Sequence, residues 1–278
     1  MRVLFSAVIA AAALAALAAQ AQDLAATCHA SSSYDVTLQP QGVLFDRSTP
    51  APTRVELHDG SSFPTRRSSD LELRDGSLRT DGVAVVLTPS QQDRLSVFER
   101  GVRALAPRVR QVARNGVDMA MQALRAEVEG LGLSAATRVE FDRRLAAHAS
   151  ELKQRIASSQ STHDWQGDLI QQYANQVSAD LMPLVAGDLG QQAIDAALAG
   201  DLQRAADLRD RAGSLMTTLQ PRLQQRMQAL RPQIEALCPS IQRLARLQQG
   251  LHDAHERPLN LLQVGAASDG SAVAPSSD

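Results

Sequence analysis

The pattern of apolar and polar residues changes character once along the chain, near residue 88. Before that point, short stretches of alternating apolar and polar residues are separated by turn dipeptides, which is typical of antiparallel strands. After it, apolar residues recur at spacings of three and four, which is typical of helices that pack through one face. The pattern predicts an α+β protein: a small N-terminal antiparallel β meander (residues 22–87) followed by a mostly α-helical body (residues 88–263).

Turn chemistry supports this division. Asp-Gly dipeptides, which favour tight hairpin turns, predict the connections of the meander. We expect strands at 34–38, 42–45, 53–57, 71–74 and 83–87, with turns at 59–60, 75–76 and 81–82. Thr88, Pro89 and Gln91 form a helix start, because the threonine oxygen can accept a backbone N–H, proline suits the first turn and glutamine can reach back.

Prolines, glycines and capping residues predict where the helical body is divided. Pro107 should kink or break the first helix near Ala106, because proline removes a backbone hydrogen bond and clashes one turn back. Further interruptions are expected at Pro183, Gly187, Pro221, Pro232 and Pro239. Ser134 should cap one helix; Gly200 should close a short helix over 191–199, and Asp201 should cap the next.

Residues 62–77 look foreign to the meander. The segment 62–71 matches one reading frame of a common short-read sequencing adapter, and residues 55–61 are nearly repeated by residues 71–77. Deleting residues 62–77 would restore an unbroken pair of hairpin turns. One hypothesis is an assembly artefact; the alternative is a basic, serine-rich surface loop between tandem hairpins. Under either hypothesis, Arg66 and Arg67 are not a binding patch.

The two ends of the chain differ from the rest. Residues 1–21 carry one positive charge, an apolar run and an Ala-x-Ala ending, which predicts a signal peptide, with an uncleaved anchor as the alternative. After cleavage we expect no integral membrane protein. Residues 264–278 are rich in Gly, Ala, Ser, Pro and Asp, which predicts a disordered tail.

The chain has two cysteines, Cys28 and Cys238. In an exported protein a thiol pair tends to oxidise, so we predict a disulfide between them. The alternative is two separate buried thiols. No C-x-x-C is present, which argues against a catalytic redox pair.

The net charge and the histidines argue against several classes of function and identify no site. The formal net charge is −2, so nothing indicates a nucleic-acid partner. His252 and His255 could share a metal on a helix, and His163 with Asp164 could suggest acid–base chemistry. A solvated helix end and a helix cap explain these pairs better. No recognised catalytic motif is present, so we assign no catalytic, cofactor-binding or metal-ligating residue and do not expect an enzyme.

Paired glutamines recur on the predicted helices. One interpretation is that they make soluble, polar helix faces; the other is that they form a surface that holds unfolded or amphipathic partners, as in periplasmic chaperones. Several segments together resemble the YggN-like periplasmic proteins of Gram-negative bacteria. They are Cys28, residues 34–36, 85–92, 106–107, 115–120 and 237–239. The resemblance implies an exported protein of unknown function and carries over no active-site residue.

The leading hypothesis is a periplasmic structural or interaction protein that binds envelope proteins or lipids. One alternative is a periplasmic hydrolase or metal-dependent enzyme with an unrecognised site. A cavity joining His148, His163 or His252 to carboxylates would support that alternative. Another is an apolar small-ligand or lipid binder, which needs an apolar pocket of roughly 300 Å³ or more.

Overall fold

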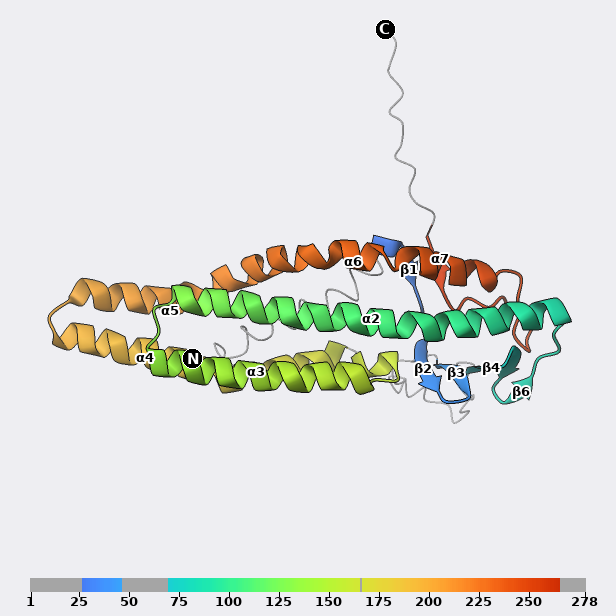
Figure 1. Ribbon diagram of the computed structural model, residues 1–278, viewed down its shortest axis with the longest axis horizontal. Coiled ribbons are helices and arrows are strands. Elements are labelled where there is room, and N and C mark those ends of the chain that lie inside the picture. The colour runs from blue at the N-terminus through green and yellow to red at the C-terminus, as the bar shows by residue number, and fades with distance from the viewer. Residues whose placement is uncertain (1–26, 47–69, 166, 266–278) are drawn as a thin grey trace, which may run out of the picture. The chain divides into compact units, whose positions relative to one another are not determined.

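The computed structural model describes residues 27–46, 70–165 and 167–265 (Figure 1). The predictions for the signal peptide, the strand at 53–57, the turn at 59–60 and the tail from 266 lie outside the described residues. Of the suspected insertion, residues 62–69 also lie outside them. The predicted α+β class is confirmed: an antiparallel strand meander precedes a mostly helical body.

The chain divides into two compact units. Among the described residues, the strand-containing unit combines those of 27–103 with those of 237–265, and the helical unit comprises those of 104–236. The strand-containing unit is therefore built from segments on both sides of the helical unit in the sequence. Helix α2 (Pro89–Gly130) contributes its first part to one unit and its second part to the other.

An antiparallel sheet in the order β2-β3-β4-β5-β6 forms the centre of the strand-containing unit. Its strands are β2 (Asp35–Gln39), β3 (Gly42–Asp46), β4 (Leu71–Arg74), β5 (Ser77–Thr80) and β6 (Val83–Ala84). Val43 pairs with Leu73, which pairs in turn with Leu78, and all three side chains are buried. The last strand is shorter than the predicted 83–87, and Val83 and Val86 are 60% and 99% exposed.

The first part of α2 packs its apolar face on this sheet. Phe45 and Phe98 are buried with ring centroids 6.1 Å apart, and Leu95 is fully buried. The predicted helix start is confirmed as a reciprocal capping box. The Thr88 N–H donates to the Gln91 side chain at 2.9 Å, and the Gln91 N–H donates to Thr88 Oγ1 at 3.3 Å.

An ion pair on α2, between the buried Glu99 and the partly exposed Arg103, holds two hairpin turns. Glu99 accepts from the Asp75 N–H at 2.9 Å and from Arg103 Nε at 3.2 Å. Arg103 donates onward to the carbonyl oxygens of Gln39 and Gly42, at 2.7 and 2.8 Å. One helical turn thus satisfies backbone groups at both the β2–β3 and the β4–β5 connections.

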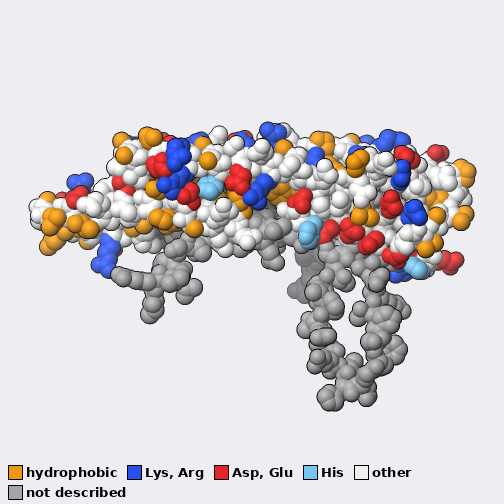
Figure 2. Space-filling view, turned by 90° about the horizontal axis from the view of Figure 1, so that it is seen from below, with side chains coloured by type: hydrophobic (Ala, Val, Ile, Leu, Met, Phe, Trp, Pro, Cys, Tyr) orange, Lys and Arg blue, Asp and Glu red, His pale blue; other side chains and the backbone are white. Residues whose placement is uncertain are grey.

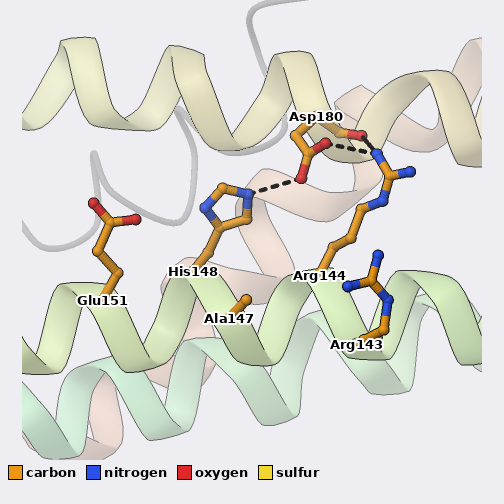
Figure 3. Close-up of a pocket in the computed structure, with 6 residues that line it drawn as sticks. All are labelled: Arg143, Arg144, Ala147, His148, Glu151 and Asp180. Carbon is orange, nitrogen blue, oxygen red and sulfur yellow. Dashed lines mark hydrogen bonds and ion pairs between the residues drawn. The ribbon is translucent and has the colours of Figure 1, made fainter.

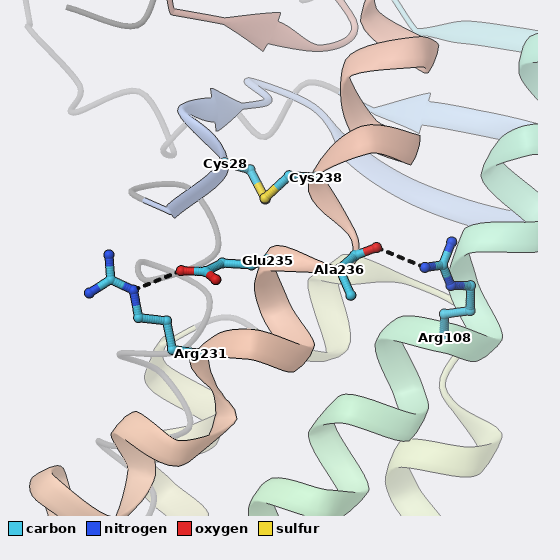
Figure 4. Close-up of a disulfide and its surroundings, with 6 residues drawn as sticks. All are labelled: Cys28, Arg108, Arg231, Glu235, Ala236 and Cys238. Carbon is cyan, nitrogen blue, oxygen red and sulfur yellow. Dashed lines mark hydrogen bonds and ion pairs between the residues drawn. A yellow bond between two sulfur atoms is a disulfide. The ribbon is translucent and has the colours of Figure 1, made fainter.

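The disulfide between Cys28 and Cys238 is confirmed, with Cα atoms 5.1 Å apart (Figure 4). Cys238 is the first residue of α7 (Cys238–Leu247), and Cys28 lies two residues before β1 (Ala30–Ser31). Strand β1 pairs with β7 (Gln263–Val264). The chain re-enters the strand-containing unit at Leu237. Its last described helix ends at Leu247, short of the predicted helical body to residue 263, and residues 248–262 follow an irregular path to β7.

The helical unit is assembled from the second part of α2 and the helices that follow it: α3 (Ala135–Ser158), α4 (Gly167–Leu198), α5 (Leu202–Met227) and α6 (Arg231–Glu235). Two 3₁₀ turns, η1 (Thr162–Trp165) and η2 (Gln228–Leu230), connect them. Its buried side chains are mainly aliphatic and include Val117, Phe141, Leu145, Leu152, Tyr173, Val177, Leu181, Leu189 and Ile234.

The helix breaks predicted at Pro183, Gly187 and Pro221 are wrong, and of the kink or break predicted near Ala106 the break does not occur. Helix α2 continues through Pro107, α4 through Pro183 and Gly187, and α5 through Pro221. A proline costs one backbone hydrogen bond, but a long helix with a buried face offsets that loss by packing. Pro232 and Pro239 do mark divisions, because each lies at the start of a short helix.

Candidate functional site

A pocket of about 340 Å³ lies in the helical unit against α3 and α4 (Figure 3). Its lining residues are Arg143, Arg144, Ala147, His148, Glu151 and Asp180. Five of these six side chains are ionisable, so the pocket does not match the predicted apolar ligand site. It does join His148 to carboxylates, which is the arrangement that the enzyme alternative requires.

The two helices meet here through hydrogen bonds to one carboxylate. His148 Nε2 lies 2.9 Å from Asp180 Oδ2, and Arg144 Nη1 lies 2.6 Å from Asp180 Oδ1. Burial by itself would raise the pKa of Asp180, but these bonds from His148 and Arg144 lower it below its ordinary value. Asp180 is therefore ionised at neutral pH, and His148 Nε2 carries the donated proton.

The arginines are also held by Glu140. Arg143 pairs with Glu140 at 2.7 Å and Arg144 at 2.6 Å. Hydrogen bonds from Arg143 and then from Arg144 lower the pKa of Glu140 to about 2. Both guanidinium groups are thus partly neutralised before any ligand arrives.

Tyr173, on α4, contacts both the backbone and the ring of His148. Its hydroxyl donates to the His148 carbonyl oxygen at 2.7 Å, and the two rings meet edge to face with centroids 6.2 Å apart. Burial, with a smaller contribution from Glu151, raises the pKa of Tyr173 to about 12. The His148 ring is therefore held by Asp180 on one side and its backbone by Tyr173 on the other.

The His148–Asp180 pair is one component that a hydrolytic site would need. A carboxylate that fixes the tautomer of a histidine can support general-base chemistry. The pocket lining contains no serine, threonine or cysteine that could act as a nucleophile. The hydrogen bonds from Arg144 and His148 on α3 to Asp180 on α4 can equally serve only to hold the two helices together.

The other predicted histidines are dispersed. His163 is exposed in η1, and Asp164 accepts hydrogen bonds from Ser159 and Ser161, in line with a capping role. His252 and His255 lie beyond the last helix, so the predicted helical pair is wrong. His255 faces Asp81 at 3.8 Å. Within the described ranges, no three metal-ligating side chains gather into a possible metal site.

A second feature lies at the connection between α4 and α5, in the segment 191–207, which we call the hairpin end. Three large apolar side chains are exposed there: Ile194 by 56%, Leu198 by 82% and Leu202 by 71%. Figure 2 shows hydrophobic side chains gathered where these helices meet, at the left of the view. Val86 and Val139 are comparably exposed elsewhere, but here three large apolar side chains lie within nine residues of sequence.

The backbone of the hairpin end is tightly fixed. Gly200 has φ +80°, and the Asp201 N–H donates to the Ala196 carbonyl oxygen at 2.9 Å, which closes α4 as a Schellman motif. Asp201 Oδ1 then accepts from the Arg204 N–H at 3.0 Å and caps α5. Gly200 ends a helix and Asp201 caps the next, as predicted, but the helix that Gly200 ends is the long α4 and not a separate short helix over 191–199. The apolar side chains are displayed on two ordered helix ends.

Sequence reasoning missed both features for different reasons. The partners His148 and Asp180 are far apart in sequence, and only the antiparallel packing of α3 and α4 unites them. Ile194 and Leu198 are spaced as a buried face would be, so periodicity alone suggests burial. The signal that could have found them is the glycine turn at Gly200, which places these residues at the last turn of a helix.

Comparison with known proteins identifies a family but no activity. Within the described residues, none of the helices combines the length and apolar character needed to cross a membrane. No curated protein and no solved structure matches the chain. The model of a family described as protein of unknown function (DUF2884) matches residues 67–262, which is more than half of the chain. The chain therefore belongs to this uncharacterised family.

Proposed function

We propose that the chain is an exported, YggN-like periplasmic protein of Gram-negative bacteria that acts by binding other molecules of the cell envelope, with the hairpin end as its contact surface. The observation that carries this proposal is the exposure of Ile194, Leu198 and Leu202 on a fixed helical turn. Contiguous exposed apolar side chains mark binding surfaces, because leaving them in water has a free-energy cost that function must justify.

Export is supported by two independent features. The N-terminal segment 1–21 has the pattern of a signal peptide, and the Cys28–Cys238 disulfide is of a kind that persists in oxidising compartments.

The proposal is tested by placing a photo-crosslinking amino acid at Leu198 in cells that export the protein. A matched control carries the same amino acid at Val139, which is 70% exposed on α3. We expect light-dependent adducts at Leu198, with the crosslinked segments identified by mass spectrometry, and few at Val139. Equal adducts at both positions, or none at Leu198, would overturn the proposal.

Hydrolysis with water as the nucleophile is a second candidate function, favoured by the His148–Asp180 pair in its pocket. It predicts turnover of simple chromogenic esters or phosphoesters by the purified protein. The activity should disappear in His148→Ala and survive in Val139→Ser. Absence of turnover at any pH between about 5 and 9 would remove this candidate.

A further inference from the structure

The charges around the hairpin end indicate what kind of partner it binds. The segment 191–207 contains three carboxylates, Asp195, Asp201 and Asp207, and one cation, Arg204, which gives a local net charge of −2. The carboxylates surround the exposed Leu198 and Leu202 in sequence, and all four charged residues are exposed. The carboxylates nearest to Leu198 and Leu202 in sequence, Asp195 and Asp201, have no cation between them, whereas Arg204, Arg209 and Arg211 follow on α5.

This charge pattern discriminates among occupants. A second copy of the chain would bring an identical acidic surface, and an anionic lipid surface would also repel it. A polypeptide segment with an apolar centre and flanking lysine or arginine residues is complementary on both counts. We propose that the hairpin end binds such basic-flanked apolar polypeptide segments in extended or unfolded chains; this inference rests on the proposed function.

The size of the surface sets the affinity. Three large side chains are far fewer than the roughly 20–30 residues that each partner contributes to a stable interface. Binding is therefore weak and rapidly reversible, with a Kd of about 10–100 μM. A contact of this kind samples exposed segments of incompletely folded chains and releases them, which a permanent complex would not do.

The hydrogen bonds of the turn keep the surface available without prior rearrangement. Gln191 Nε2 donates to Asp195 at 2.9 Å, and Gln203 Nε2 donates to Asp207 at 3.2 Å. A carboxylate can accept more than one hydrogen bond, so Asp195 can also accept from a partner's ammonium or guanidinium groups. Asp207 lines a pocket together with Arg204 and Arg211. The leucines and carboxylates are thus presented together on one ordered turn.

Fluorescence anisotropy of labelled peptides with the oxidised, signal-free chain tests the inference. One peptide has a short core of leucine, alanine and serine flanked by paired lysines, and the other has the same core flanked by paired glutamates. We expect the lysine peptide to bind at least about fivefold more tightly, and less tightly at ~0.5 M salt, where screening is nearly complete.

Variants locate the binding. The double variant Leu198→Ser/Leu202→Ser should weaken binding of the lysine peptide by about tenfold or more, because burial of two leucines is lost. Asp195→Asn/Asp207→Asn should remove the preference for lysine and spare the apolar contribution. Val139→Ser should bind as the wild type does, and circular dichroism should show unchanged helicity in every variant.

Each alternative outcome overturns a different claim. Equal binding of the two peptides, or tighter binding to phosphatidylglycerol vesicles, overturns the partner class and leaves the proposed function standing. Sedimentation that shows concentration-dependent self-association of the wild type, and none in the leucine variant, also overturns the partner class. Binding that the leucine substitutions do not alter overturns the inference as a whole. The proposed function is tested separately: it fails if the photo-crosslinking amino acid at Leu198 gives no adducts in cells, or no more than at Val139.

Discussion

At the scale of single residues, two glycines that look equivalent in sequence differ in their surroundings. Gly76 and Gly82 each follow an aspartate in a tight turn, and both have positive φ, +80° and +78°. A Cβ on Gly76 would lie 2.6 Å from the Gln92 carbonyl oxygen, whereas a Cβ on Gly82 would meet nothing within 4 Å. Conformation and close approach can therefore be separated by experiment.

We predict that Gly76→Ala lowers the free energy of unfolding by about 3 kcal/mol, and Gly82→Ala by only about 1 kcal/mol. Both variants incur the left-handed backbone cost, and only the first adds a clash with α2. Urea unfolding of the purified protein at neutral pH measures both values. Equal losses would show that the approach of the β4–β5 turn to α2 is not close.

Asp188 gives a prediction for pH. Its burial would raise its pKa, but hydrogen bonds from Ser134 together with those from Thr137 and Gln192 lower it below the ordinary value. A carboxylate with a lowered folded pKa stabilises the protein above its unfolded pKa, near ~3.9, and loses that contribution as pH falls through the folded value. Asp188 belongs to α4 and accepts a hydrogen bond from the backbone N–H of Ser134, the confirmed N-cap of α3.

We therefore expect Asp188→Asn to lower the free energy of unfolding by about 1 kcal/mol at pH 7, a value kept small because the side chain is half-exposed. The difference between wild type and variant should shrink as the pH falls from about 5 toward 3. Asp142→Asn, in an exposed pair with Arg125, is the matched control and should change stability little. A difference that grows on acidification would contradict this account.

At the scale of elements, β4 bears on the suspected insertion. Leu71 and Leu73 are 1% exposed, and β4 pairs with both β3 and β5, so the second copy of the repeated sequence is built into the sheet. The first copy, residues 55–61, has the same alternation and the same Asp-Gly-Ser ending. It is therefore a ready substitute for β4.

Deletion of residues 62–77 should leave a folded protein in which residues 55–57 occupy the place of 71–73. Valine for leucine at one buried position should cost only about 1 kcal/mol. Cooperative thermal unfolding, followed by circular dichroism, checks this, and deletion of residues 71–80 serves as a control that removes both β4 and β5. If the first deletion abolishes cooperative unfolding as the control does, the artefact hypothesis loses its structural support.

At the scale of the whole molecule, the disulfide joins the two segments that make up the strand-containing unit. It closes a loop of 210 residues, within which the entire stretch 104–236 is contained. In the chain-entropy model, so long a loop contributes about 5 kcal/mol by restricting the unfolded chain. The segment from Leu237 onward depends on this link more than any other, because it returns to the unit after the full helical excursion.

We predict that Cys28→Ser/Cys238→Ser lowers the free energy of unfolding by about 4–5 kcal/mol. Hydrogen exchange should locate the loss chiefly in α7, β1 and β7. Wild type treated with reductant should match the variant in urea unfolding, and reductant should leave the variant itself unchanged. Equal stability of oxidised wild type and variant would contradict the prediction.

Local chemistry made much of this architecture predictable. The capping box at Thr88, the Asp-Gly turns and the Gly200–Asp201 connection each depend on residues a few positions apart. The cysteine pair was predictable because only one pairing exists. The His148–Asp180 contact and the exposure of Leu198 were not predictable, since both depend on how α3, α4 and α5 pack. Pro107 and Pro183 misled prediction, because packing outweighed a single lost hydrogen bond.

The central claim is that the protein works through the hairpin end and not through the pocket at His148. Hydrogen–deuterium exchange of the oxidised protein, with and without the lysine-flanked peptide, tests it most directly. The account predicts slower exchange within residues 191–207 and no change within residues 143–151. Slower exchange around His148 with an unchanged hairpin end would contradict it.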